Sequence, residues 1–251
     1  MNAMWSEARI KVGHRLAMHL RIDDGLFLRN RTPRVSFTFD DLPKSAVTSG
    51  ARLLEEFGAR GTFYVSGGEV GVDTPDWETG NAADVVNLHR RGHEIGCHTF
   101  SHTRACDVGM IGLADEIERN RTWLHELDPD IATETFAYPF GMGSFTQKYL
   151  LKEKFRTCRS IVPGVNAGFV DLQFLHASPL IDRDMDRDGI DRLFDEAAST
   201  NGWLIFYGHD VAEKPSLYGC TPDLLRHALA AATRLKIPVL TMAEALRCAR
   251  P

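Results

Sequence analysis

Residues 35–41 read Val-Ser-Phe-Thr-Phe-Asp-Asp, a short run of branched and aromatic residues that ends in two adjacent carboxylates. This composition predicts a β-strand, whose side chains alternate between its two faces. Asp40 and Asp41 would diverge in a continuing strand, but at a strand end that turns at Leu42 and Pro43 both can face one pocket. Adjacent buried acids need a cation or a shared proton. A solvated strand end, or an aspartate that caps the next helix, is the simpler alternative.

Strands and helices alternate along the rest of the chain. The predicted strands lie at 34–39, 61–65, 93–96, 135–137, 158–162, near 174–176, at 203–207 and at 238–240. The predicted helices lie at 44–57, 82–91, 111–127, 146–155, 190–199 and 222–235. This order indicates an α/β fold with parallel strands joined by helical crossovers. We predict one folded domain at 33–251, preceded by a polar, weakly helical N-terminal extension at 1–32 that packs on the outside of the domain.

The composition of the chain bears on whether it binds nucleic acid or membranes and on the cellular compartment in which it works. The 251 residues carry a formal net charge of −5, which gives no bulk attraction to nucleic acid or to an anionic membrane. There is no apolar run of about 18 residues, so we expect no transmembrane segment. Charged residues and histidines interrupt the N-terminal segment, so we see no signal peptide and expect a cytoplasmic protein. Five scattered cysteines argue against a disulfide framework, and the oligomeric state is not indicated.

A histidine pair suggests a metal site. In the sequence HTFSH, His98 and His102 have the i, i+4 spacing that places two imidazoles on one face of a helical turn. With a carboxylate from elsewhere, such a pair can bind one metal and leave positions open for water and substrate. The same spacing also occurs without a metal. Cys97 and Cys106 offer a rival closed Cys/His zinc site, which the direct adjacency of Cys97 and His98 disfavours.

Four polar clusters follow predicted strands. They are Asp40-Asp41, the histidines after Gly96, the turn at 138–141 and His209-Asp210. Parallel sheets and barrels place their functional sites at the carboxyl ends of the strands, so we expect the four clusters to meet. His209 follows a strongly apolar strand and suits a general acid, although a core histidine bonded to a backbone carbonyl would have the same context.

These motifs, in this order, resemble those of the polysaccharide deacetylases, the NodB-homology group that forms carbohydrate esterase family four. The motifs are TFDD at 38–41, GHEIGCHTFSH at 92–102, FAYPFG at 136–141 and GHD at 208–210, and GTFYV at 61–65 resembles the family's second strand. The resemblance implies a distorted (β/α) barrel of about seven parallel strands. It also implies an N-acetylated carbohydrate substrate and a divalent metal, commonly zinc, at the mouth of the barrel.

The resemblance also implies the roles of five residues. Asp41, His98 and His102 would hold the metal. Asp40 would act as the general base on a water whose pKa the metal lowers from near 16 to roughly 7. His209 would protonate the leaving amine.

The third motif departs from the family pattern. Its turn, Tyr138-Pro139-Phe140, would bind the substrate and hold the oxyanion through the backbone N–H of Phe140. Many family members have an arginine two residues before this proline, paired with the base, whereas this chain has Ala137. The partner of Asp40 is therefore unassigned.

The fourth motif of the family, an aspartate near a tryptophan that orients the catalytic histidine, has no clean match. Asp182 and Arg183 lie in about the right region and are our candidates for supporting contacts around the site. No tryptophan lies near them in the sequence.

We therefore predict a metal-dependent hydrolase that removes N-acetyl groups from a sugar, an oligosaccharide or a polysaccharide. The alternatives are an amidase of the same fold acting on a small non-sugar amide or ureide, a two-His-one-Asp iron oxygenase, and a metal-binding module without catalysis.

Overall fold

The computed structural model describes residues 2–22, 25–28 and 30–249. Residues 1, 23–24 and 29 of the predicted extension, and residues 250–251 of the predicted domain, lie outside the described residues.

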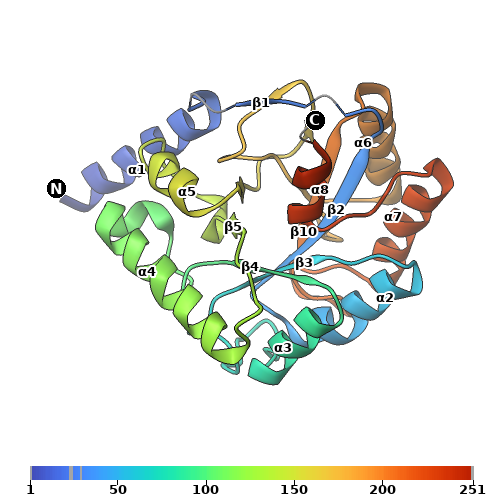
Figure 1. Cartoon of the computed structure of the whole chain (residues 1–251), viewed down its shortest axis with the longest axis horizontal. Helices are drawn as coiled ribbons and strands as arrows, with labels where there is room; N and C mark the ends of the chain where they lie inside the picture. The colour runs from blue at the N-terminus through green and yellow to red at the C-terminus, as the bar shows by residue number, and fades with distance from the viewer. Residues whose placement is uncertain (1, 23–24, 29, 250–251) are drawn as a thin grey trace.

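Seven parallel strands curl into a barrel that a ring of helices surrounds (Figure 1). In spatial order they are β6 (Thr157–Arg159), β5 (Thr135–Ala137), β4 (Glu94–Cys97), β3 (Thr62–Val65), β2 (Arg34–Asp40), β10 (Trp203–Gly208) and β9 (Ser178–Pro179). Two short antiparallel pairs are added, β10 with β7 (Val165–Asn166), and β1 (Leu26–Phe27) with β8 (Phe169–Val170). The predicted single-domain, distorted (β/α) barrel of about seven parallel strands is confirmed.

An irregular segment, residues 172–179, closes the barrel between β6 and β10. The backbone N–H groups of Cys158 and Ser160 donate to the carbonyls of Leu172 and Leu175, at 2.7 and 2.9 Å. The end of the same segment is β9, which pairs with β10. The strand expected near 174–176 is thus reduced to one bridge, between Arg159 and Leu175, because the segment leaves β6 to reach β10.

The helices lie mainly where the apolar pattern predicts them. They are α1 (Asn2–His19), α2 (Ala51–Glu56), α3 (Ala82–Arg90), α4 (Ala105–Leu127), α5 (Gln147–Lys154), α6 (Arg187–Thr200), α7 (Pro222–Leu235) and α8 (Met242–Ala249). The helix expected at 44–57 begins as a π-helical turn, η1 (Ala46–Gly50), before α2. The helix expected at 111–127 starts earlier, at Ala105, and kinks at Gly109, whose φ of 65° glycine tolerates.

Side-chain alternation along β2 points Asp40 into the barrel. Phe37 and Phe39 pack outward in the apolar core shared with the surrounding helices. The intervening side chains point inward, where Ser36 accepts a hydrogen bond from the Trp203 indole at 3.0 Å and Thr38 donates to the Phe206 carbonyl. Asp40 continues this inward series at the end of the strand.

The amino end of the barrel is closed by α8, which lies inside the ring of helices in Figure 1. Arg34 at the start of β2 donates to the Ala245 carbonyl at 2.7 Å. The Ala243 backbone N–H donates to Glu94 at the start of β4 at 2.9 Å. The sequence did not predict α8, and the strand expected at 238–240 amounts to a single bridge between Val35 and Val239. Access to the interior is therefore from the carboxyl end.

A buried lysine ties the N-terminal segment to the barrel. Lys148 on α5 donates to the carbonyls of Ala17 and Leu20 at the end of α1, and it forms an ion pair of 2.7 Å with Asp171. Of the helices in the described ranges, none combines the length and hydrophobicity that a membrane span requires.

Candidate metal centre and active-site pocket

The carboxyl end of β2 turns sharply at Asp41. Asp40 is the last residue of the strand and is buried, and Asp41 and Leu42 both adopt left-handed conformations, with φ of 63° and 54°. This turn reverses the side-chain alternation, so both carboxylates line one pocket, as the sequence predicted.

The two histidines of HTFSH lie on a loop, not on the helical turn that we expected. Thr99 and His102 have positive φ, which an α-helix excludes. The carboxylate of Glu116 on α4 holds this loop, accepting hydrogen bonds from the backbone N–H groups of Phe100 at 3.0 Å and Ser101 at 2.7 Å. The result still brings the two rings together, with centroids 5.0 Å apart.

Three imidazoles surround the Asp41 carboxylate. Its Oδ1 lies 3.6 Å from His98 Nε2 and 3.3 Å from His102 Nε2, and its Oδ2 lies 3.6 Å from His209 Nε2. One donor atom from each of Asp41, His98 and His102 lies within 4.8 Å of the others, which is close enough for the three to hold one metal ion.

Protonation and orientation of these groups fit a divalent cation. The Nδ1 of His98 lies 2.8 Å from the Ala137 carbonyl, so a proton there leaves Nε2 free as a ligand. Burial lowers the pKa of His98 to about 3 and also lowers the pKa of His102, which keeps both rings neutral. Burial raises the pKa of Asp41 to about 7, and its buried Oδ1 has no hydrogen-bond donor among the described residues. A metal ion bound to Oδ1 would supply the interaction partner that this buried oxygen lacks.

The rival Cys/His zinc site does not form. Burial raises the pKa of the Cys97 thiol to about 11, and its sulfur accepts a hydrogen bond from the Asn120 amide at 3.3 Å. Within the part of the chain that the structure describes, the group of potential ligands contains neither Cys97 nor Cys106.

Arg159 is the partner of Asp40 that the sequence left unassigned. Its guanidinium lies 2.5 Å from Asp40 Oδ1, and the arginine is fully buried between the rings of Tyr64 and Tyr207. Burial alone would raise the pKa of Asp40. The charge of Arg159, helped by nearby imidazoles, outweighs burial and holds the pKa of Asp40 below its usual range.

The register of the sheet explains this substitution. Ala137 on β5 pairs directly with Arg159 on β6, so the arginine stands one strand away from the position expected in the third motif. The signal in the sequence was an arginine inside a predicted strand, at the second position of CRSIV. Because the pairing of β5 with β6 could not be read from the sequence, Arg159 could not be assigned as the partner of Asp40.

An aromatic cluster fixes His209 at the end of β10. The Trp77 ring stacks on the His209 imidazole, with centroids 5.4 Å apart and planes 29° apart, and Tyr218 packs against both rings. His209 Nδ1 lies 3.3 Å from the Tyr218 carbonyl. Trp77 belongs to an irregular loop, in which the Thr74 hydroxyl accepts from the Trp77 backbone N–H. The tryptophan beside the histidine thus comes from a different part of the chain than the fourth motif.

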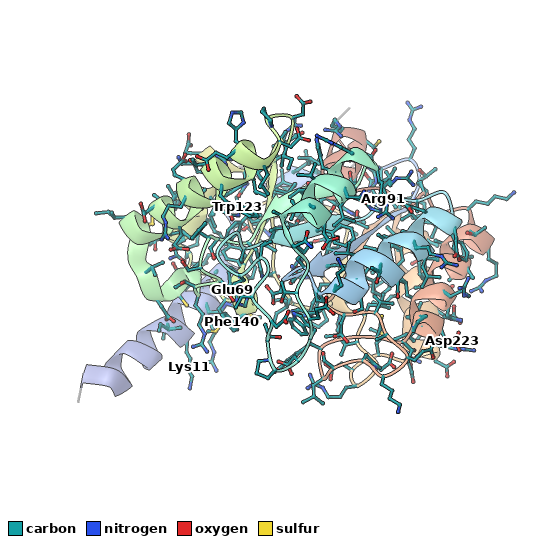
Figure 2. All side chains as sticks on the ribbon, turned by 90° about the horizontal axis from the view of Figure 1, so that it is seen from below. Lys11, Glu69, Arg91, Trp123, Phe140 and Asp223 are labelled. Atoms are coloured by element: carbon teal, nitrogen blue, oxygen red, sulfur yellow. The ribbon has the colours of Figure 1, made fainter. Side chains whose placement is uncertain are left out.

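The third-motif turn contributes Phe140 to the mouth of the pocket. Phe140 has a φ of 57°, the residue is 51% exposed, and its ring packs on that of His102 with centroids 4.6 Å apart. Tyr138 and Pro139 are buried behind it, and the Tyr138 hydroxyl donates to the Gln173 carbonyl at 2.9 Å. These two residues shape the turn, whereas Phe140 and Gly141 line the pocket. Figure 2 shows Phe140 and Glu69 on one side of the molecule and Arg91, which precedes β4, on the other.

Backbone strain concentrates around the pocket. Of the seven described non-glycine residues with positive φ, two end helices α6 and α7. The other five lie in the three loops of the site: Asp41, Leu42, Thr99, His102 and Phe140. Such conformations cost about 1–3 kcal/mol each and persist where the surrounding structure enforces them. The backbone of these loops is therefore locally unfavourable, and the surrounding structure holds it in the conformation that brings the side chains of the site together.

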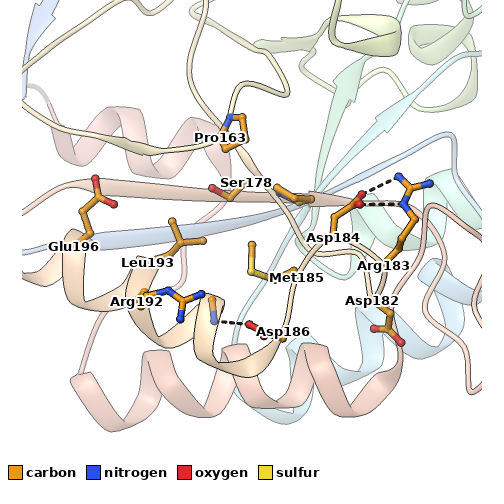
Figure 3. Close-up of a pocket in the computed structure, with 12 residues that line it drawn as sticks. Pro163, Ser178, Asp182, Arg183, Asp184, Met185, Asp186, Arg192, Leu193 and Glu196 are labelled. Atoms are coloured by element: carbon orange, nitrogen blue, oxygen red, sulfur yellow. Dashed lines mark hydrogen bonds and ion pairs between the residues drawn. The ribbon is translucent and has the colours of Figure 1, made fainter.

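Asp182 and Arg183, the two candidates for supporting contacts, make different contacts. Asp182 accepts a hydrogen bond from the Thr221 backbone N–H at 3.0 Å, at the start of α7. Arg183 lines the pocket and forms a two-point ion pair with Asp184, at 2.9 and 2.8 Å. Figure 3 shows the Asp182 side chain pointing away from this pair.

The pocket has a volume of about 480 Å³ and combines aromatic walls with ionisable groups. It holds the potential metal ligands, the ionised Asp40 and the imidazole of His209 in one place. A cation site, a base and an acid in one pocket suit the hydrolysis of an amide or ester.

Comparisons with known proteins support this chemistry. The family model described as Polysaccharide deacetylase matches residues 28–154, about half of the chain. A chitin deacetylase from Arthroderma benhamiae is 30% identical over 86 residues, which are 34% of this chain and 22% of that protein. The match therefore spans less than a quarter of the curated relative.

Solved structures show the same fold. A family 4 acetyl xylan esterase from Clostridium thermocellum, in complex with a cobalt ion, is 20% identical, with a TM-score of 0.59 over 85% of this chain and 90% of that chain. A peptidoglycan deacetylase from Bacillus subtilis is 14% identical, with a TM-score of 0.60 over 87% of this chain and 92% of that chain.

Proposed function

The chain belongs to the polysaccharide deacetylase family, and we propose that it is a metal-dependent hydrolase that removes N-acetyl groups from an N-acetylated sugar, oligosaccharide or polysaccharide. The observation that carries this proposal is the meeting of the Asp41, His98 and His102 cluster with Asp40 and His209 in one pocket.

Asp41, His98 and His102 would hold the metal. A divalent ion held there, which we propose to be zinc, would lower the pKa of a water molecule and would stabilise negative charge on the acetyl oxygen. We propose that the backbone N–H of Phe140, whose left-handed turn lies beside His102, adds a hydrogen bond to the same oxygen.

Asp40 acts as the general base. Its ionised carboxylate accepts the proton of the water that attacks the acetyl carbon, and Arg159 keeps it ionised and fixed in place. Because Arg159 is buried and held between two tyrosine rings, Asp40 does not rotate away from the pocket.

His209 acts as the general acid. As the carbon–nitrogen bond breaks, its imidazole donates a proton to the leaving nitrogen, so the products are acetate and an amine. The stack on Trp77 and the contact of Nδ1 with the Tyr218 carbonyl direct Nε2 into the pocket.

Product analysis tests the proposal. N-Acetylglucosamine oligomers incubated with zinc-loaded protein should release acetate, and a chelator should abolish the release until zinc is restored. Ammonia release from small amides, with no acetate from any of the sugars, would instead support the amidase alternative.

A further inference from the structure

Asp210 directly follows the proposed general acid, His209, and is buried. Both of its carboxylate oxygens accept hydrogen bonds from Ser216, Oδ1 from the hydroxyl at 2.6 Å and Oδ2 from the backbone N–H at 2.8 Å. We propose that Asp210 is a positioning residue, which folds the loop at 211–219 so that the backbone carbonyl of Tyr218 orients the imidazole of His209. This inference rests on the proposed deacetylase function.

The loop at 211–219 is wrapped around the Asp210 carboxylate. Its two ends are joined by backbone hydrogen bonds, from the Cys220 N–H to the Asp210 carbonyl at 3.0 Å and from the Ala212 N–H to the Cys220 carbonyl at 3.1 Å. Gly219 lies so close to the carboxylate that a Cβ at this position would collide with it. Only glycine permits such an approach, so the backbone of the loop is fitted to the buried carboxylate.

Ser216 links Asp210 to Tyr218. The Ser216 hydroxyl, which donates to Asp210, also accepts a hydrogen bond from the Tyr218 backbone N–H at 3.0 Å. The Tyr218 carbonyl lies 3.3 Å from His209 Nδ1, and the Tyr218 ring packs against the imidazole with centroids 5.8 Å apart. A chain of contacts therefore runs from the Asp210 carboxylate through Ser216 and Tyr218 to the His209 imidazole, although Asp210 itself does not need to touch the ring.

The acceptor at Nδ1 determines what Nε2 of His209 does. A backbone carbonyl accepts a hydrogen bond and cannot donate one, so the contact with Tyr218 requires a proton on Nδ1. Nε2 is then the nitrogen that faces the pocket, 3.6 Å from Asp41 Oδ2, and it is the nitrogen that gives its proton to the leaving amine. Without this acceptor the neutral ring holds its single proton on either nitrogen and is free to turn over.

The dependence of the rate on the leaving group tests this role. Asp210→Ala should lower kcat/KM for N-acetylglucosamine oligomers about 10–100-fold, because a misplaced acid does not protonate the leaving amine. Hydrolysis of 4-nitrophenyl acetate should fall less than about twofold, since 4-nitrophenolate leaves without a proton. The zinc content should be unchanged. A similar loss on both substrates would make Asp210 merely structural, and no loss on either would also overturn the inference.

Three further variants make the test specific. Ser216→Ala breaks the link without removing a buried carboxylate and should show the same selective loss, and Ser216→Thr keeps the hydroxyl and should retain the wild-type rate. Asp128→Ala removes another buried aspartate, which accepts from the Asp130 backbone N–H at 3.2 Å after α4, and should behave as wild type. If Asp210→Ala fails to fold, the two Ser216 variants carry the test, and equal rates in both would overturn the inference.

Nitrogen NMR of the imidazole keeps the test independent of turnover. In zinc-loaded protein with isotope-labelled histidines, the His209 signals are those that the His209→Gln variant lacks. For the neutral ring we expect the proton on Nδ1 in the wild type and in Ser216→Thr, and a mixture of tautomers in Asp210→Ala and Ser216→Ala. An unchanged Nδ1 proton in both alanine variants would overturn the inference. The expected tautomers without acetate release from the sugars would refute the deacetylase and leave the positioning role standing.

Discussion

Arg159 on β6 forms a buried ion pair with Asp40 at the end of β2, and Arg159 is the direct cross-strand neighbour of Ala137. Many members of the family have an arginine at the position of Ala137, whereas in this chain the register places the charge one strand further on. The guanidinium that pairs with the Asp40 carboxylate thus comes from β6, the strand next to β5. A barrel permits this exchange because inward-pointing side chains of adjacent strands reach the same interior point.

Removing the charge of Arg159 should shift the acid limb of activity. Asp40 must be ionised to act as base, and without the guanidinium its burial would raise its pKa. Arg159→Gln should therefore move the acid limb of kcat/KM to higher pH by at least about one unit and lower the stability by about 3–5 kcal/mol at neutral pH. A pH–rate profile and thermal unfolding measure the two effects.

Two further variants make this prediction specific. Arg156→Gln removes an exposed arginine of the same segment, which pairs with Glu134, and should leave the profile unchanged. The double variant Ala137→Arg/Arg159→Ala restores the family arrangement and should recover part of the activity. An acid limb that stays in place in Arg159→Gln would show that Arg159 does not control the ionisation of Asp40.

Metal affinity should weaken as the pH falls below 7. In the metal-free protein Asp41 has a pKa of about 7, so below that pH a metal must displace one proton. His98, with its pKa of about 3, is already deprotonated there. The apparent zinc affinity should therefore drop about tenfold per pH unit below 7 and level off above it. Competition titrations with a zinc indicator measure this slope, and a flat profile across the range would exclude Asp41 as a ligand.

Glu116 should control metal affinity without touching the metal. Its carboxylate holds the backbone of Phe100 and Ser101, between the two histidine ligands. Glu116→Ala should weaken zinc binding about 10–100-fold, the range seen when supporting contacts of ligands are lost. Glu118→Ala, on the same helix but exposed and paired with Lys154, is the matched control. Unchanged zinc affinity in Glu116→Ala would mean that the loop holds its shape unaided.

Loss of the general acid should separate catalysis from metal binding. His209→Gln should lower kcat about 10²–10⁴-fold and retain zinc, because Asp41, His98 and His102 remain. His102→Ala should lose zinc and activity together. Measuring bound zinc by elemental analysis beside kcat tells the two apart, and a His209→Gln protein that loses its zinc would make His209 a ligand instead of an acid.

The parts of the site that could be predicted are those encoded within single strand ends. Asp40, Asp41, His98 and His209 each lie at the end of a predicted strand, and His102 follows His98 by four residues; parallel strands bring such ends to one face. Their convergence on one pocket follows from this rule, and the structure shows it.

The parts that could not be predicted depend on relations between distant segments. Arg159 reaches Asp40 through the register of β5 and β6, and Trp77 reaches His209 from an irregular loop without periodicity. The helical turn predicted for the histidine pair was wrong, because hydrogen bonds from the loop backbone to Glu116 on α4 replace those of a helix. Local sequence patterns do not contain these long-range contacts.

The most direct test of the central claim is turnover and zinc content of the Asp40→Asn variant. Asparagine keeps the shape and an oxygen acceptor for Arg159 but cannot take a proton from water. We predict that the variant binds one zinc and retains its affinity for N-acetylglucosamine oligomers, while acetate release falls by at least about 10²-fold. Near-normal acetate release from a zinc-loaded Asp40→Asn protein would contradict the assignment of Asp40 as the base.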